Sequence, residues 1–422
     1  MRTSRYPWRA AGVTAAVVAV VAAATAGCGS DDDDSGTGKS DSAALGAEKV
    51  ATGSPVTVGF ISEGKAAAFD TSGELDGAQA AVDYINNHLG GLQGHKIELK
   101  TCQSKGNPGT ATDCANQMVS SGAVAVAEGS LGVIDQTIDV LSPAAVPLVL
   151  NFATSQKALS KPNVFSMMNG VSAVFGTPAM LAKEEGIKKV ALVTIDVPAA
   201  TGAANSIGKL TIGNAGAALD VVTVPPGTPD MTPQITAAKK KDPGMWIVLG
   251  ETTFCGGALK AIKTASPDTT VVVNDRCIDP SIASAVPGGF EGVKVGTTSN
   301  LDPSTEDVKL FQAAIDKYKP GTKIDANSAG GWAPVVALAR AVNAGSGTDV
   351  TRESVLNAIR TAPPLDYPLT NGIKFQCDGK AFPLSPNLCA ASAIVTTATK
   401  EGKLTDHRIL ETDVSLFKPP SS

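Results

Sequence analysis

Two patterns of apolar and polar residues alternate along most of this chain. VTVGF at 56–60, VAVAEG at 124–129 and VPLVLN at 146–151 are short apolar runs, which are typical of buried parallel strands. Between such runs, as in SGELDGAQAAVDYINNHL at 72–89, apolar residues recur at helical spacing until a glycine pair ends the helix. The alternation predicts parallel sheets that are covered by helices on both faces.

This alternation occurs in two series. The first predicts strands at 56–60, 95–102, 124–129 and 146–151, with helices at 72–89, 109–121 and 131–141. The second predicts strands at 188–196, 219–225, 245–250, 269–275 and 293–299, with helices at 199–218, 231–241, 255–265 and 280–286. Two such series indicate two doubly wound lobes.

The pattern changes near residue 300, where three helices follow one another and then a hairpin. The helices are predicted at 304–318, 327–344 and 351–360, and the hairpin in NGIKFQCDGKAF and SAIVTTATKEGKL. Successive helices cannot all cover a sheet to which the chain never returns, so we expect re-entry into the first lobe. The expected fold class is α/β, with two doubly wound parallel-sheet lobes and a hinge of three crossings near 172, 299 and 365. Lobe 1 would comprise 55–172 and 300–365, and lobe 2 would comprise 173–299 and 366–422.

The N-terminus has the layout of a bacterial export signal. Three arginines precede the uncharged apolar run at 10–24, which is short for a membrane span. TAGC at 25–28 resembles a lipobox, with Thr25 at the place of the usual Leu, so we expect a signal peptide at 1–27 and lipidation of Cys28. The alternative is ordinary cleavage nearby, with Cys28 a free thiol. The polar, acidic stretch at 28–54 is predicted to be a disordered tether.

Charge and cysteine usage exclude several classes of function. Without 1–27 the chain has 32 basic and 40 acidic residues, which argues against a nucleic-acid partner. Six further cysteines are expected to form disulfides outside the cytoplasm, and proximity favours the pairs Cys102–Cys114, Cys255–Cys277 and Cys377–Cys389 among fifteen connectivities. There is no C-x-x-C, and the three histidines lack ligand spacing. Nucleophile-elbow, Walker and dinucleotide motifs are also missing, so we expect no metal, no cofactor and no enzyme activity.

Several phrases together resemble the type I periplasmic solute-binding proteins, specifically the branched-chain amino-acid-binding group that serves ABC importers. The resemblance covers roughly residues 55–400. It is carried by VTVGFISEG, LDGAQAAVDYIN with GGLQGHKIEL, AEGSLG, VPLVLNFAT, FEGVKVGTTSN and AGGWAPVVALARAV. C-x11-C at 102–114 lies where many members have a disulfide. The resemblance implies a monomeric binding lipoprotein, held to the outer face of the cell membrane, that closes on a small polar ligand and delivers it to a permease.

In the first lobe, the resemblance implies ligand contacts at strand ends. Ser130 opens the helix after 124–129, and its hydroxyl and the following amides suit a carboxylate. Ala153 and Thr154 follow 146–151 and offer a carbonyl, an amide and a hydroxyl. Phe69 lies in the first strand-to-helix loop, where the family has an aromatic residue that lines the cleft. The plainer alternatives are that Ser130 caps its helix, Thr154 supports a turn and Phe69 packs in the core.

In the second lobe, the resemblance implies an acid that pairs with the ligand's ammonium group. Asp275 ends the strand TTVVVND, and Glu251 is a second candidate at the end of the neighbouring strand. Asp275 could instead pair with Arg276 or cap the next helix. Thr253 stands where members that bind leucine-like side chains often have an aromatic residue, so leucine is not carried over as the ligand. A rival function is a receptor that presents its ligand to a membrane signalling protein.

Overall fold

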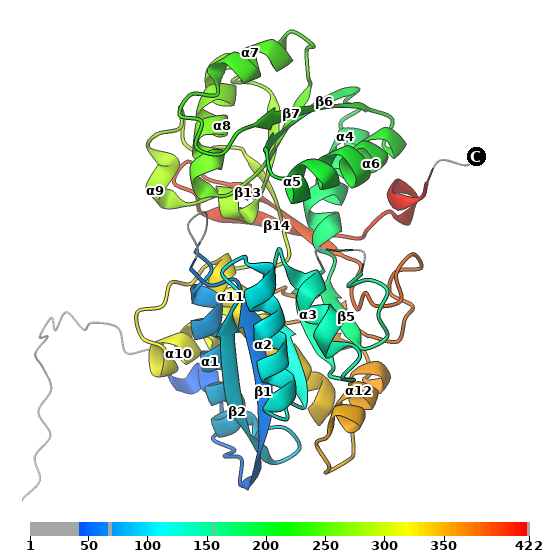
Figure 1. The fold of residues 1–422 in the computed structure, drawn as a ribbon. Helices are drawn as coiled ribbons and strands as arrows, with labels where there is room; N and C mark the ends of the chain where they lie inside the picture. Colours follow the sequence, from blue (N-terminus) through cyan, green and yellow to red (C-terminus); the bar gives the residue numbers. More distant parts are fainter. Residues whose placement is uncertain (1–41, 66–69, 154, 156, 420–422) are drawn as a thin grey trace, which may run out of the picture. The chain divides into compact units, whose positions relative to one another are not determined.

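Two sheets form the centres of two α/β lobes (Figure 1). The structure is a computed structural model that describes residues 42–65, 70–153, 155 and 157–419. The first sheet has the strand order β2-β1-β3-β4-β5, and all of its pairings are parallel. The second has the order β14-β13-β10-β9-β8-β6-β7 and is parallel except at β13 and β14. The predicted α/β class with two parallel-sheet lobes is therefore confirmed.

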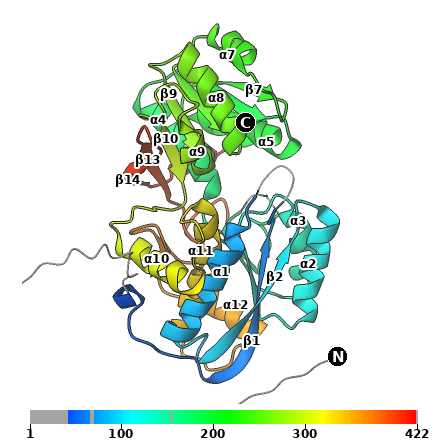
Figure 2. The same cartoon turned by 90° about the vertical axis from the view of Figure 1, so that its left-hand side faces the viewer.

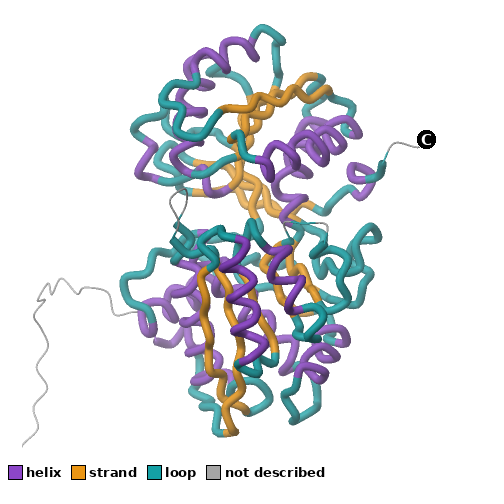
Figure 3. The backbone as a smooth tube through the Cα atoms, viewed as in Figure 1, coloured by secondary structure: helices purple, strands orange, loops and turns teal. Residues whose placement is uncertain are grey.

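The first lobe places helices on both faces of its sheet, as Figures 2 and 3 show. Alternate residues of a strand point to opposite faces, so Phe60 packs toward α1 and α11 while Ile61 packs toward α2 and α3. The strands are β1 (Gly53–Ser62), β2 (His95–Gln103), β3 (Ala125–Glu128), β4 (Leu148–Phe152) and β5 (Val164–Met168). The helices are α1 (Gly73–Tyr84, continued by a π-helical turn at Ile85–Leu89), α2 (Pro108–Ser120), α3 (Ile134–Leu141), α10 (Glu306–Tyr318), α11 (Ala326–Asn343) and α12 (Arg352–Thr361).

The second lobe repeats this three-layer arrangement. Trp246 and Val248 pack toward α7 and α8, whereas Met245 and Ile247 face the side covered by α4 and α6. The strands are β6 (Lys189–Ile195), β7 (Ala218–Val224), β8 (Met245–Leu249), β9 (Thr270–Asn274), β10 (Lys294–Thr297), β13 (Ala393–Ala398) and β14 (Leu404–Leu410). The helices are α4 (Thr177–Glu184), α5 (Pro198–Ala203), α6 (Lys209–Asn214), α7 (Thr232–Lys239), α8 (Thr252–Ala265) and α9 (Pro280–Ala283).

The third crossing between the lobes lies later than the expected residue 365. Tyr367 and Phe375 are buried in the core of the first lobe, and the Cys389 amide donates to the carbonyl of Ser166 on β5 at 2.8 Å. The chain joins the second sheet only at Ala393. The expected hairpin is also different, because Lys374–Phe375 (β12) pairs with Leu365–Asp366 (β11), whereas β13 pairs with β10 and β14. The apolar residues between β11 and β13 predict that this segment is buried, but the sequence does not indicate in which lobe.

The segment before β1 packs on the first lobe over the residues that the structure describes. Leu45, in a short 3-10 helix at Ser42–Leu45, is buried against the core, and the Lys49 and Ala51 amides donate to the carbonyls of Asn87 and Asn86. From residue 42 on, the predicted tether is therefore attached to the first lobe by Leu45 and by backbone hydrogen bonds, although Val50 is exposed. Cys28, the predicted signal peptide and the rest of the tether lie outside the described residues.

Three disulfides join the cysteine pairs that proximity favours. They link Cys102 to Cys114, Cys255 to Cys277 and Cys377 to Cys389. The first ties β2 to α2, the second ties α8 to the turn after β9, and the third closes the loop that packs beside β5. No described helix combines the length and the hydropathy that crossing a membrane would require.

Candidate functional site

Helices α1 and α11 of the first lobe and loops of both lobes line a small cavity beyond the carboxyl ends of the strands. It has a volume of about 40 Å³, and its polar lining includes Glu74, Ser130, Asn151, Asp275, Arg276 and Tyr367. At roughly 15 Å³ for each water, this volume holds about two or three water molecules or a single polar group. A larger cavity of about 470 Å³ shares Asp275, Ser299 and Ala326 with it. The two cavities together form the cleft between the lobes.

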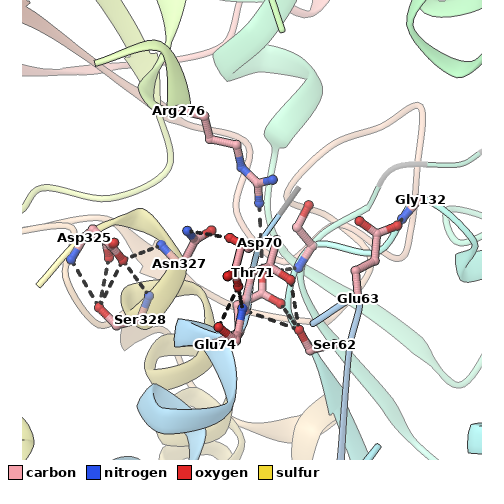
Figure 4. Close-up of polar contacts among 12 residues, drawn as sticks. Ser62, Glu63, Asp70, Thr71, Glu74, Gly132, Arg276, Asp325, Asn327 and Ser328 are labelled. Atoms are coloured by element: carbon pink, nitrogen blue, oxygen red, sulfur yellow. Dashed lines mark hydrogen bonds and ion pairs between the residues drawn. The ribbon is translucent and has the colours of Figure 1, made fainter. Parts of the chain in front are cut away.

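Glu74 is the buried acid of this cleft, with its side chain 1% exposed. Its Oε2 accepts the hydroxyl of Ser62 at 2.6 Å, and its Oε1 accepts the backbone N–H of Ser130 at 2.8 Å (Figure 4). Burial raises the pKa of Glu74 to about 7, although Arg276 and both hydrogen bonds act in the opposite direction. The carboxylate is therefore costly to ionise and is held in place by donors from two neighbouring segments.

Close packing of α1 on α11 holds Glu74 in this place. A Cβ added at Gly331 of α11 would overlap the Glu74 carbonyl oxygen, and one at Gly77 of α1 would overlap the carbonyl oxygen of Ser328. Only glycine lets the two backbones approach this closely. Asp325 caps α11 by accepting the amides of Asn327 and Ser328, which fixes where the helix begins beside the cleft (Figure 4).

Two more glutamates lie beside Glu74 in the first lobe. Glu63 follows β1, and its Oε1 accepts the N–H of Gly132 at 2.7 Å. Burial raises the pKa of Glu63, while the Gly132 bond and the Arg276 charge lower it. Glu128 ends β3 and is fully buried, and among the described residues neither of its carboxyl oxygens has a hydrogen-bond partner. Burial raises its pKa to about 8, which the nearby Thr137 hydroxyl partly offsets.

The second lobe contributes Asp275 and Arg276 from the 3-10 turn that follows β9. Asp275 Oδ2 accepts the Thr297 hydroxyl at 2.7 Å. The Arg276 guanidinium extends toward the first lobe, where Nη2 lies 3.9 Å from Glu74 Oε1, and its side chain is 32% exposed (Figure 4). The Cys255–Cys277 disulfide anchors the same turn to α8. Arg276 therefore forms an ion pair with Glu74, not with its neighbour Asp275.

The structure brings Ser130 and Asp275 together in the small cavity. Ser130 does not cap α3, because the cap position is Val133. Ala153 lies elsewhere: its amide donates to the Ser166 hydroxyl at 2.7 Å, and it lines a mainly apolar cavity of about 300 Å³ beside β5.

The remaining predicted site residues stay apart from the cavity or are not described. Glu251 is the N-cap of α8 and accepts the amides of Phe254 and Thr253, while Thr253 is exposed in the first turn. Neither lines the small cavity or the larger one. Phe69 and Thr154 lie outside the described residues.

Sequence reasoning missed Glu74, Arg276 and the pair in which the Tyr367 hydroxyl donates to Asn151 Oδ1 at 2.7 Å. Glu74 had a recognisable signal, because it shares a helical face with Ala78 and Ala81, which are both buried. An acid on the apolar face of a helix needs a partner. Among the described residues, no group of His, Cys, Asp or Glu is arranged to hold a metal ion.

Comparisons with known proteins agree on the fold. A family model described as periplasmic binding protein matches residues 55–384. An ABC transporter substrate-binding protein from Sphaerobacter thermophilus is 18% identical, with a TM-score of 0.69 over 86% of this chain and 100% of that one. No match was found among curated protein sequences.

Two further solved structures contain ligands. The branched-chain amino acid transporter substrate binding protein from Streptococcus pneumoniae, in complex with isoleucine, is 19% identical, with a TM-score of 0.66 over 85% of this chain and 99% of that one. A solute binding protein of an ABC transporter from R. palustris, in complex with 4-hydroxybenzoate, is 18% identical, with a TM-score of 0.69 over 85% and 97%. At these identities the likeness shows the fold alone.

Proposed function

Because the chain belongs to the periplasmic binding protein family, we propose that it captures a small polar solute outside the cytoplasm for an ABC importer. The observation that carries this proposal is the cavity between the lobes, which is lined by Glu74 and Ser130 from one lobe and by Asp275 and Arg276 from the other. Polar groups that converge from two lobes on one small space are suited to bind a solute. Binding, and not catalysis, is the proposed role.

The proposed mechanism is hinge closure. Three chain segments link the lobes, after β5, after β10 and before β13, so one lobe can rotate against the other. A solute that contacts Ser130 and Asp275 together makes these contacts only when the lobes are close. Differential affinity for the closed state then shifts the population toward it. Closure would present to a permease a surface that the open protein lacks.

The N-terminal sequence supports export and anchoring. We propose that residues 1–27 are a signal peptide and that Cys28 receives lipid, so that the protein is a monomer attached to the outer face of the cell membrane. Mass spectrometry of the membrane fraction would test this, with an acylated N-terminal Cys28 as the expected result. An N-terminus at another residue would contradict it.

A thermal-shift screen tests the binding proposal. The panel is amino acids, amines, amides and carboxylates. A ligand at about 100 times its dissociation constant should add about 2.7 kcal/mol to the free energy of unfolding. Asp275→Asn should lower the affinity for the hit at least tenfold. The matched control is Asp268→Asn, an exposed residue at the other end of β9. No shift across the panel, or equal effects of both variants, would contradict the proposal.

A second candidate function is a receptor that presents its ligand to a membrane signalling protein. The same closure would serve it, so the binding experiment applies to both. Pull-down of the ligand-loaded, full-length protein from detergent-solubilised membranes distinguishes them. Recovery of a permease supports the importer role, and recovery of a sensor protein supports the receptor role.

A further inference from the structure

We propose that the solute is an organic cation whose ammonium or guanidinium group sits between Glu74 and Asp275, at the place of the Arg276 guanidinium, with no carboxylate beside that group. The inference rests on the proposed function and names the class of solute. It concerns the small cavity, which Glu74, Asp275 and Arg276 line together with Ser130.

The first step is that the protein's own carboxylates use the amides that would bind a ligand carboxylate. The Ser130 N–H donates to Glu74 and the Gly132 N–H donates to Glu63, at 2.8 and 2.7 Å. Backbone amides at the start of such a loop are ordinarily a favourable place for an anion. Here a ligand carboxylate would find those two donors occupied and would approach two buried glutamates of like charge.

The second step is the charge of the cavity wall. Glu74 comes from the first lobe and Asp275 from the second. Arg276 is the one Lys or Arg among the described residues that line the small cavity, and its guanidinium points toward Glu74 (Figure 4). Glu63 adds a further carboxylate beside it, since the charge of Arg276 acts on both glutamates. A cationic group placed here is attracted by acids from both lobes, so it would hold them together.

The third step is that Arg276 occupies this place only loosely. Its Nη2 lies 3.9 Å from Glu74 Oε1, whereas a charge-assisted N–H···O bond is about 2.7–2.9 Å long. The side chain is also 32% exposed and can turn toward solvent. A ligand cation that is free to approach Glu74 directly can therefore displace it.

The fourth step is size. The small cavity of about 40 Å³ suits a single cationic group, and it shares Asp275, Ser299 and Ala326 with the cavity of about 470 Å³. The remainder of a solute can extend into this larger space, which is lined by Leu301 and Ile324. Charged side chains also line it, namely Asp279, Lys323, Asp325 and Lys403. An amine or guanidine with an aliphatic chain fits this shape, with its cationic group in the small cavity and its chain in the larger one.

Isothermal titration calorimetry with matched pairs of solutes tests the proposal. Isoamylamine and leucine differ only by the carboxylate beside the amine, as do isobutylamine and valine, and tyramine and tyrosine, and each of these solutes has a single cationic group. We expect the decarboxylated member of at least one pair to bind at least tenfold more tightly. An amino acid that binds as tightly as its amine, or tighter, would overturn the proposal.

Variants on the two sides of the cavity sharpen the test. Glu74→Gln should reduce the affinity for the amine at least tenfold, whereas Glu98→Gln, an exposed residue of β2, should leave it unchanged. Arg276→Gln should raise the affinity for the amine several-fold, because a competing cation is removed. Loss of amine binding in Arg276→Gln would overturn the displacement of Arg276, even if Glu74→Gln failed to fold.

The outcomes separate this inference from the proposed function. Tight binding of a neutral or anionic solute alone would refute the cation site and would leave the solute-binding role standing. No binding by any amine, amino acid, amide or carboxylate in the panel would refute both. Tight binding of an amine that depends on Glu74 and Asp275 would support both.

Discussion

In the first lobe, glutamates lie buried under the cleft, whereas in the second lobe two of the acids that follow the strands cap helices near the surface. Glu74 and Glu128 are almost completely buried, and burial raises the pKa of each. Glu251 and Asp279 follow β8 and β9, and their carboxylates accept backbone amides of α8 and α9. The same alternation of strands and helices thus allows an acidic residue after a strand either to be buried under the cleft or to cap the next helix.

The difference between the lobes teaches where function is placed in such a fold. A capping carboxylate accepts the free backbone amides of its own helix, so it does not change which groups of the cleft can bind a ligand. A buried carboxylate that takes the amide of another loop, as Glu74 takes that of Ser130, changes what the cleft can bind. In this molecule the first lobe supplies the buried carboxylates of the cleft, and the second lobe supplies Asp275 and the partly exposed Arg276 opposite them.

The largest expected effect concerns the packing that places Glu74. Gly331→Ala forces a methyl group into the backbone of α1 at Glu74, so we expect the free energy of unfolding to fall by about 1–3 kcal/mol. The matched control is Gly213→Ala in α6 of the second lobe, where an added Cβ meets nothing within 4 Å. That variant should change stability by less than about 1 kcal/mol, in the stabilising direction. Urea unfolding measures both, and equal losses would contradict the comparison.

For each pH unit, an intermediate effect is expected from Glu128. Its pKa is raised to about 8 from the usual value of 4.5, so between these pH values the folded state binds more protons than the unfolded state. The free energy of unfolding should therefore fall as the pH rises from about 5 to 8. One differentially bound proton contributes a slope of up to about 1.4 kcal/mol per pH unit.

Glu128→Gln should flatten this dependence, because it removes one of the titrating groups. Urea unfolding at pH 5, 6, 7 and 8 measures the slope for the variant and for the unaltered chain. Glu98→Gln, at an exposed position, serves as the control and should keep the original slope. If Glu128→Gln also keeps the original slope, Glu128 does not titrate in this range.

The smallest effect is expected from Glu251 in the second lobe. Glu251→Ala removes the acceptor for the amides of Thr253 and Phe254, which should lower the free energy of unfolding by about 1 kcal/mol. Because the carboxylate faces its own helix and not the cleft, the ligand affinity should stay the same. Calorimetry and urea unfolding on one sample separate the two effects. If Glu251→Ala lowers the ligand affinity and leaves the free energy of unfolding unchanged, Glu251 contacts the ligand and this prediction is wrong.

The sequence by itself determined the α/β class, the two lobes and the disulfide pairs. These follow from local information: apolar runs of strand length, helical spacing and cysteines close in sequence. It also predicted that Ser130 and Asp275 follow strand ends, and such ends gather at one edge of a parallel sheet. The two residues do share the cavity. The sequence could not assign residues 367–390 to a lobe. Their apolar side chains predict that the segment is buried, but either lobe could bury it.

Only the tertiary structure decided which groups in the cleft are already paired. Glu74 and Arg276 lie 202 positions apart, and no local pattern connects them. From the sequence, the Ser130 amide is expected to be a free hydrogen-bond donor. In the structure it donates to Glu74. The glycines of α1 and α11 allow this contact, because they let the first turn of α1 lie beside the loop after β3. The charge of a cleft is a sum over side chains from distant segments. It is therefore settled by packing, and the order of residues along the chain does not reveal it.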